Sequence, residues 1–545
     1  METIAVILLL LLAVVVSGAI ARVSPLNIPL PLVQIALGAA MDAFGSLGVE
    51  LKPDIFFLLF LPPLLFLDGW RIPKEGLFRD KTTIAELAFG LVIFTVVGVG
   101  FFVHWLIPAM PLGVAFALAA ILSPTDPVAV TAIAARVPIP HRVMHILEAE
   151  ALLNDASGLV CMRFAVAAVL TGTFSLVNAA GTFVWLAGAG VAIGFVMTWV
   201  TTQAKNWIAR KFGEETGSQI LISLLIPFGA YLLAEEAHAS GILAVVSAGI
   251  AMSYAEAGGQ ALATTRIRRN VVWDTIAFAA NGIIFVILGE QLPQIVVRAE
   301  RVVHDTGHHE AIWLLLYVAA ITAALAALRF VWVWTSLRFT LFRRGQDGGL
   351  SRAQLRVVGA ISLAGVRGAI TLAGVLTLPL TLYSGAEFPA RGLAICLAAG
   401  VIIASLVTAS IGLPRLLRGL ELPEDTEHQR QEDRARVAAA EAAIEAVERQ
   451  LHEKAAGRHD AELYTDAGAR IMTLYRQRID GRSKSGREAE AARRQDDIER
   501  HLRLAALRAE RGEIFRLARA RELSDDTARK LVREIDLVET RLGTG

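Results

Sequence analysis

Two short stretches of the sequence place carboxyl groups inside apolar runs. SPTDPVAV carries Asp126 between two prolines, and EALLNDASGLV, which begins at Glu150, carries Asn154 and Asp155. An ionised carboxyl group in hydrocarbon costs a few kcal/mol or more, so such residues indicate a functional site. A buried aspartate beside an amide is stable either protonated or as the ligand of a small cation. We therefore predict that a proton and a cation compete for Asp155.

The two prolines of the first stretch predict an interrupted helix. Pro124 and Pro127 lack backbone donors and disfavour helical geometry in the residues before them, Ser123 and Asp126. Unwound backbone at membrane depth is stable only inside protein or beside an aqueous cavity, where its carbonyl oxygens can bind a hard cation. Asp126 then either offsets a half-helix end or binds the cation. A simple kink, with Asp126 satisfied by neighbouring hydroxyl groups, is the structural alternative.

A third stretch, LAGVRGAITLA, places the permanently charged Arg367 between two glycines. This pattern predicts a second interrupted helix, in which Arg367 pairs with a carboxylate or faces helix carbonyls. A structural ion pair of Asp155 with Arg163 or Arg367 is the alternative to a cation-binding role for Asp155. For Glu150 a structural ion pair and a functional role are both open.

The composition shows that these stretches lie in a membrane protein. Of the 545 residues 55% are hydrophobic and only 19% are charged, which excludes an ordinary soluble domain. A membrane span needs about 20 apolar residues. About thirteen candidates meet that length, near residues 3–20, 27–45, 53–69, 84–107, 112–136, 143–171, 179–203, 217–237, 239–254, 271–293, 311–340, 355–378 and 389–413.

The charges between the spans predict the topology. Lys and Arg gather in every second connection, which places the N-terminus outside and the C-terminus in the cytoplasm. The interrupted spans are the fifth and the twelfth, which correspond if spans 1–6 and 8–13 form two inverted repeats. The predicted fold is therefore an all-α polytopic membrane protein with two inverted repeats and crossed broken helices.

The sequence divides into two regions, a transmembrane domain at residues 1–413 and a charged C-terminal region at residues 414–545. The second region repeats Ala, Leu, Glu and Arg at helical spacing, which predicts exposed cytoplasmic helices. Breaks are expected near residues 458–460 and 479–487, and Ser524 is expected to cap the last helix.

The three stretches, in this order and at these separations, resemble the bacterial sodium/proton exchangers of the monovalent cation:proton antiporter family. FLPPLLFLDGWRIPK, from Phe60 to Lys74, resembles the third-span motif of that family. The resemblance covers about residues 9–413, and the tail resembles the cytoplasmic tail of bacterial members. It implies a secondary transporter rather than an enzyme, which works as a homodimer in the inner (plasma) membrane by alternating access.

The resemblance assigns roles to individual residues. It makes Asp155, beside Asn154, the shared ligand of the proton and the cation. It gives the backbone carbonyl of Thr125, next to Asp126, and the carboxylate of Glu150 as further ligands. The monovalent cation is thus expected between Asp155, Thr125 and Glu150.

Two positions depart from the family pattern. Ala151 stands where a hydroxyl-bearing ligand is common, so this coordination position is expected to be filled by water or by Ser157. Ser123 is a further secondary candidate ligand. The acidic partner expected for Arg367 is shifted by one residue to Asp68, and a pair of these two is a hypothesis.

The predicted activity is exchange of one H⁺ for one monovalent cation, because the neutral Asn154 leaves a single carboxylate to exchange both. Na⁺ is the expected cation, Li⁺ and K⁺ are open, and a K⁺-selective exchanger is the alternative. No cofactor and no nucleic acid are expected, and membrane lipid is expected to surround the protein. The tail is expected to bind a regulator, to self-associate or simply to be solvated.

Two other functional classes fit less well. An intramembrane aspartyl protease would also use two buried aspartates, here Asp126 and Asp155. The sequence lacks the Gly-x-Gly-Asp and Pro-Ala-Leu motifs that such a protease needs. A cation channel would need a selectivity-filter repeat, and none is found.

Overall fold

A computed structural model describes most of the chain. The described residues are 2–24, 28–44, 53–71, 86–126, 141–171, 176–257, 262–304, 312–340, 352–382, 384–418, 426–455, 461–483, 487–524 and 525–543. They form helices and connecting turns, with no strand beyond one isolated bridge between Thr381 and Glu387. The prediction of an all-α fold is confirmed.

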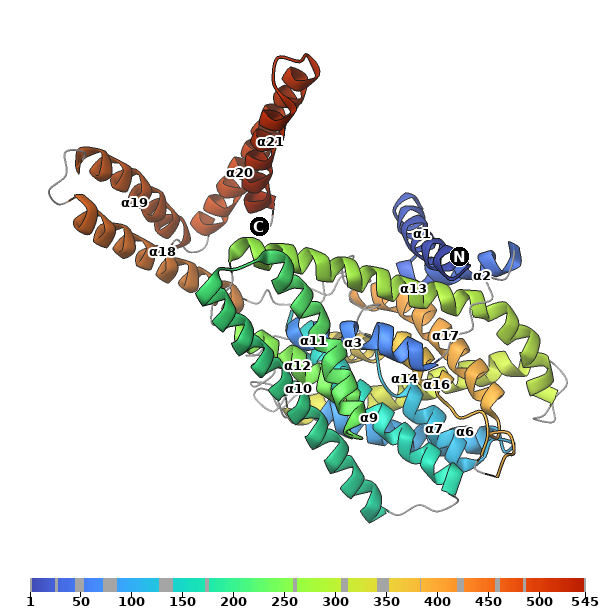
Figure 1. Ribbon diagram of the computed structural model, residues 1–545. Coiled ribbons are helices and arrows are strands. Elements are labelled where there is room, and N and C mark those ends of the chain that lie inside the picture. The colour runs from blue at the N-terminus through green and yellow to red at the C-terminus, as the bar shows by residue number, and fades with distance from the viewer. Residues whose placement is uncertain are drawn as a thin grey trace. The chain divides into compact units, whose positions relative to one another are not determined.

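The chain divides into two compact units, Met1–Glu421 and Leu422–Gly545. The first unit holds the apolar helices (Figure 1). Their bounds are α1 (Glu2–Val23), α2 (Leu30–Phe44), α3 (Pro53–Arg71), the π-helical turn η1 (Glu86–Leu91), α6 (Val92–Leu106), α7 (Leu112–Leu122), α9 (His141–Thr171), α10 (Leu176–Phe212), α11 (Thr216–Glu236), α12 (Gly241–Ala257), α13 (Ala263–His304), α14 (Ile312–Thr340), α15 (Arg352–Leu363), α16 (Ala369–Leu376) and α17 (Arg391–Leu417).

Each of the thirteen predicted spans overlaps at least one of these helices. Among the described residues, seven helical stretches are long and apolar enough to cross a membrane by length and composition, and four shorter apolar helices accompany them. The existence of the apolar helices is confirmed, whereas the count of thirteen spans stays a prediction.

Both predicted interruptions fall at the expected residues. Helix α7 ends at Leu122, and residues 124–126 are not helical. Helix α15 ends at Leu363 and α16 begins at Ala369, so the glycine-flanked Arg367 lies between two half-helices. Pro127 and the residues up to 140 lie outside the described residues. Pro124 and the glycines on either side of Arg367 thus lie within the two interruptions, as expected from the effect of these residue types on the backbone.

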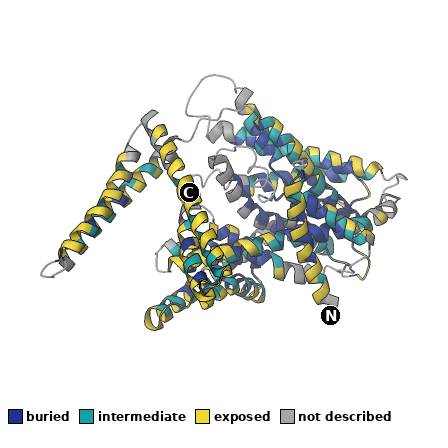
Figure 2. Ribbon diagram, turned by 90° about the horizontal axis from the view of Figure 1, so that it is seen from above, coloured by how far each residue is buried: buried dark blue, intermediate teal, exposed yellow. Residues whose placement is uncertain are grey.

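The helices of the first unit pack as two groups. The scaffold group consists of α1, α2, α3 and α10–α13, and the core group consists of η1, α6, α7, α9 and α14–α17. Contacts are dense within each group and sparser between the two groups. The main contact between the groups is that of α13 with α17. Figure 2 shows that the middle of this unit is buried and its outer helix faces are exposed.

Helix pairs recur between the two halves of the unit. The contact of α2 with α13 is matched by α12 with α3, that of α1 with α13 by α11 with α3, and that of α6 with α7 by α14 with α15. Each match joins an element of the first half to the element seven places later in the predicted order of spans. The two halves therefore share one packing pattern.

Glycines allow two of these matched pairs to pack backbone to backbone. A Cβ atom at Gly289 of α13 would overlap the backbone carbonyl of Ile35 in α2, and one at Gly249 of α12 would overlap that of Phe66 in α3. Close approach of this kind holds membrane helices together through dispersion and short contacts. The glycines fix the scaffold helices to one another.

One end of the scaffold group collects basic side chains, and we call it the basic end. Helices α3 and α10 finish there and α11 and α13 begin there, because Leu262 N donates to Glu214 (3.1 Å) and Thr216 Oγ1 lies 3.2 Å from Thr265 Oγ1. Arg71 of α3 pairs with Asp274 of α13. The other basic residues at this end are Arg210, Lys211, Arg266, Arg268 and Arg269.

The second unit contains two helical hairpins, which are mostly exposed (Figure 2). The helices are α18 (Thr426–Ala455), α19 (Ala461–Ser483), α20 (Arg487–Arg519) and α21 (Asp525–Gly543), with the breaks near the expected positions. Ser524 caps α21, because its Oγ accepts the backbone N–H of Thr527 (3.3 Å). The hydrogen bond from Arg516 lowers the pKa of Glu513 below its usual value.

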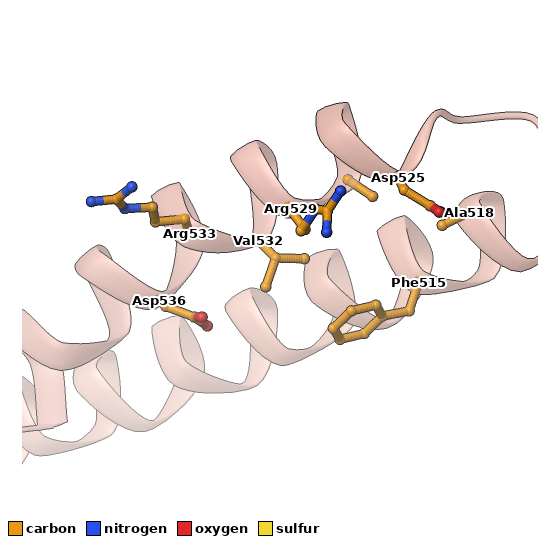
Figure 3. A pocket seen from close by; sticks show the side chains of 8 residues that line it. Phe515, Ala518, Asp525, Arg529, Val532, Arg533 and Asp536 are labelled. Atoms are coloured by element: carbon orange, nitrogen blue, oxygen red, sulfur yellow. The ribbon is translucent and has the colours of Figure 1, made fainter.

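A shallow groove runs along the α20–α21 hairpin, and Figure 3 shows the side chains that line it. Phe515 and Val532 contribute apolar surface, and Arg533 and Asp536 contribute charges of both signs. The predicted exposed helices of the tail are confirmed, but nothing on this groove indicates a ligand.

We predict that Gly289→Ala lowers the thermal unfolding midpoint of the purified protein. The new Cβ atom forces the α2 and α13 backbones apart, at a cost of about 1–3 kcal/mol. Gly188→Ala is the matched control, because nothing lies within 4 Å of its added Cβ. Equal midpoints for the two variants in the same detergent would contradict the close crossing.

Candidate cation-binding site

The two non-helical segments cross and satisfy each other's backbone groups. The backbone N–H of Asp126 donates to the carbonyl of Val366 (2.7 Å), and Nε of Arg367 donates to the carbonyl of Leu122 (2.9 Å). Arg367 Nη1 also donates to Gly365 O, and its backbone N–H donates to Ser405 Oγ of α17 (3.1 Å). Because interrupted helices leave carbonyls unpaired, this buried guanidinium supplies donors that water cannot supply there.

Asp126 lies against the start of the second half-helix. A Cβ atom at Gly368, the residue before α16, would overlap the carboxyl group of Asp126. The N-terminus of a helix carries a partial positive charge, which an adjacent carboxylate stabilises. The position of Asp126 thus fits a role in offsetting a half-helix end, while a direct role in cation binding stays a prediction.

Helix α9 approaches the first segment closely at a glycine. A Cβ atom at Gly158 would come within 2.8 Å of the carbonyl oxygen of Ala120 and of Pro124 Cδ. This approach brings Asn154 to Thr125, and Asn154 Nδ2 donates to Thr125 Oγ1 at 3.0 Å. The structure therefore joins the two stretches on which the sequence prediction rests.

The polar atoms around this contact are buried oxygens. Asn154, Asp155 and Thr125 are all buried. Asn154 Oδ1 has no hydrogen-bond partner among the described residues. A buried carbonyl oxygen without a donor is costly, and a hard cation beside it would remove that cost. Oxygens of this kind suit a small monovalent cation, and the binding of one by Asn154, Asp155 and Thr125 stays a prediction.

Asp155 has carboxylates rather than arginines as its electrostatic neighbours. It interacts with Asp126 and with Asp68 of α3. Neither Arg163 nor Arg367 forms an ion pair with Asp155 in the part of the chain that the structure describes. The structural ion-pair alternative for Asp155 is thus not observed. Asp68 is exposed and lies three residues before Arg71 on α3.

Glu150 forms a buried ion pair, which is the structural alternative left open for it by the sequence, but with a partner that the sequence analysis did not identify. Both of its carboxylate oxygens accept from Arg329 of α14, at 2.5 Å for Nη1 and 2.8 Å for Nη2. Arg329 Nε also donates to the carbonyl of Ile361, at the end of α15 (3.2 Å). The predicted role of Glu150 as a cation ligand stays a prediction, and it requires this bidentate pair to rearrange.

The remaining predicted residues lie at different distances from the contact. Ser157 and Ser123 are buried beside it, and Ser123 Oγ donates to the carbonyl of Val92 (3.5 Å). Arg163 lies further along α9 and pairs with Glu235 of α11. The pair of Asp68 with Arg367 stays a hypothesis, because Arg367 donates its hydrogen bonds to the backbone carbonyls of Leu122 and Gly365 and to Ser405 Oγ.

Comparison with known proteins places the chain in a family. The sequence pattern of the family described as "Sodium/hydrogen exchanger, transmembrane" matches residues 9–419. An uncharacterised Na⁺/H⁺ exchanger of Escherichia coli is 41% identical over 99% of this chain and 99% of its own length. A sodium, potassium, lithium and rubidium/H⁺ antiporter of Bacillus pumilus is 42% identical over 76% of this chain and 61% of its own length.

The fold is similar to a solved structure of the same kind. The sodium proton antiporter of Methanocaldococcus jannaschii superimposes with a TM-score of 0.57 and covers 77% of this chain and 99% of its own. The two sequences are 19% identical, so this likeness concerns the fold alone.

We predict that Arg329→Gln destabilises the protein by about 3–5 kcal/mol, because it leaves the buried carboxylate of Glu150 unpaired. Thermal unfolding of the purified variant measures this loss. Arg71→Gln is the control, since it removes an exposed ion pair worth about 0–1 kcal/mol. The double variant Glu150→Gln/Arg329→Gln is expected to recover part of the stability. Similar losses of stability in Arg329→Gln and Arg71→Gln would show that the buried carboxylate of Glu150 does not need Arg329 as its partner.

Proposed function

The chain belongs to the sodium/hydrogen exchanger family, and we propose that it exchanges Na⁺ for H⁺ at Asp155. The observation that carries this proposal is the contact between Asn154 and Thr125, which brings a buried carboxyl group to an interrupted helix. Asn154, Asp155 and Thr125 each carry a side-chain oxygen, and oxygens suit hard monovalent cations.

The chemistry follows from competition for one carboxyl group. When Asp155 is ionised, a cation bound beside Asn154 Oδ1 and Thr125 balances its charge in a medium of low dielectric constant. When the cation leaves, a proton neutralises Asp155, because a bare anion is costly there. Asn154 is neutral in both states, so one proton replaces one cation and no net charge moves.

Transport further requires the site to open to each side in turn. The division into a core group, which holds Asp155, and a scaffold group supports alternating access by movement of one group against the other. The matched helix pairs of the two halves support two inverted repeats, since an offset of seven spans reverses the direction of each element. The basic end is cytoplasmic by the distribution of Lys and Arg.

The residue types at the site do not determine which alkali cation is transported. Oxygen ligands alone do not separate Na⁺ from K⁺ or Li⁺. The Bacillus pumilus relative is described as an antiporter of four alkali cations, which supports testing all of them. Residence in the plasma membrane, a homodimer and binding of a regulator by the helical tail belong to the same proposal and rest on the family resemblance.

We predict that Asp155→Asn abolishes cation-driven proton movement, because the amide can neither bind a proton nor balance a cation. The assay is the recovery of a quenched pH dye in everted vesicles on addition of Na⁺, Li⁺ or K⁺. Asp274→Asn serves as the control, since Asp274 is exposed and contacts only Arg71 at the basic end among the interactions described for it. An active Asp155→Asn protein of normal stability would refute the assignment.

We also predict that the exchange is electroneutral. In proteoliposomes with a potassium gradient and valinomycin, an imposed potential should leave the initial rate of Na⁺-driven proton exchange unchanged. A rate that rises or falls steadily with potential would show that a second group, such as Glu150, titrates during the cycle.

A further inference from the structure

An ion pair joins the core group to the scaffold group at the end of the unit away from the basic end. Arg163 lies on α9 of the core group, and Glu235 lies at the end of α11 in the scaffold group. Arg163 Nη2 donates to Glu235 Oε1 at 3.4 Å, and both side chains are about half exposed. Apart from this pair, α9 and α11 pack mainly within their own groups.

The position of the pair along its helices places it beyond the site. Arg163 follows Asp155 by eight residues on α9, which corresponds to about 12 Å of helix. Helix α11 begins at the basic end, where Thr216 lies beside Thr265, and Glu235 is at its opposite end. The pair therefore lies between Asp155 and the end of the unit opposite to the basic end.

The two ends of the unit carry different charged residues near the site. Asp68, which interacts electrostatically with Asp155, is exposed and lies three residues before Arg71 at the basic end. At the opposite end the two groups are held by the ion pair, and Cys396 of α17 also contacts the carbonyl of Ile295 in α13 (3.7 Å). The ion pair and this side-chain contact thus join the two groups at the end opposite to the basic end.

We propose that Arg163 and Glu235 form a latch that keeps the site closed at the end opposite to the basic end and that separates once in each exchange cycle. The inference rests on the proposed exchange function and adds two residues to it. Most packing across the boundary is apolar, as between α13 and α17, and has no fixed direction. An ion pair is directional and keeps its full strength only in one relative position of the two groups. It therefore favours one state over the other.

The exposure of the pair sets the expected size of its effect. Half-exposed ion pairs are weak, so removing the charges in Glu235→Gln is expected to shift the equilibrium between the two states by about 1.4-fold to fivefold. A covalent link at the same place is expected to stop the cycle entirely. The decisive experiment is therefore a reversible cross-link.

The experiment uses the full-length protein with Cys161 and Cys396 replaced by serine. Arg163→Cys/Glu235→Cys is treated with a reducible bis-methanethiosulfonate reagent and assayed in proteoliposomes. Arg71→Cys/Asp274→Cys is the matched control, because it replaces an ion pair within the scaffold group. We expect the first cross-link to abolish Na⁺-driven proton exchange, a reducing agent to restore it, and the control cross-link to leave exchange unchanged. Full exchange by the protein cross-linked between positions 163 and 235 would overturn the latch.

A second measurement does not depend on transport. Spin labels at positions 163 and 235 should show a short and a longer distance whose populations change with pH and Na⁺, whereas labels at 71 and 274 should show one distance. A single unchanging distance between 163 and 235 overturns the latch even where exchange is observed. A protein that does not exchange before any cross-link refutes the proposed function, and the distance measurement still decides the latch.

Discussion

The site depends on the reciprocal hydrogen bonds between two interrupted helices. A single break in a membrane helix exposes donors and acceptors that hydrocarbon cannot satisfy. Here each non-helical segment supplies what the other lacks, since Asp126 N–H donates to Val366 O and Arg367 donates to Leu122 O. Neither segment would be stable alone, and their crossing fixes where Thr125 and Asp126 lie. Non-helical backbone, which offers carbonyl oxygens to an ion, is therefore stable here only because two interrupted helices pair with each other.

The buried ion pair of Glu150 with Arg329 ties a second set of helices to that crossing. Arg329 joins α14 to α9 through Glu150 and to the end of α15 through the carbonyl of Ile361. It therefore fixes the helix that carries Asp155 relative to the second interruption. A buried pair contributes little net stability over apolar packing, but losing one partner is costly. The Glu150–Arg329 pair acts here by fixing the position of α9, because α9 must hold Asn154 within hydrogen-bond distance of Thr125.

Local sequence rules explain how much could be predicted. Pro124 and the glycines beside Arg367 act on their own backbone, so both interruptions were predictable from neighbouring residues alone. The family resemblance placed Asp155 and Thr125 at one site, and only the resemblance gave the two stretches a common site, whereas the hydrogen bond of Asn154 with Thr125 was not predicted. The partner of Glu150 was missed, because Arg329 is 179 residues away and no local pattern links them. The signal was present as an arginine in an apolar run, LAALRFVWVW, which requires a buried acidic partner.

The contacts within the scaffold group differ in kind from the contacts between the two groups, and this difference affects how the groups can move. Within the scaffold group, glycines at 249 and 289 let backbones touch, so any sliding would bring main-chain atoms into overlap. Between the groups, the α13–α17 contact consists of side chains such as Leu288 and Ile402, which can exchange neighbours at little cost. Dispersion contacts are weak singly and depend on distance rather than direction. The proposed movement of one group against the other therefore meets less steric resistance at the apolar boundary than it would between the helices of the scaffold group.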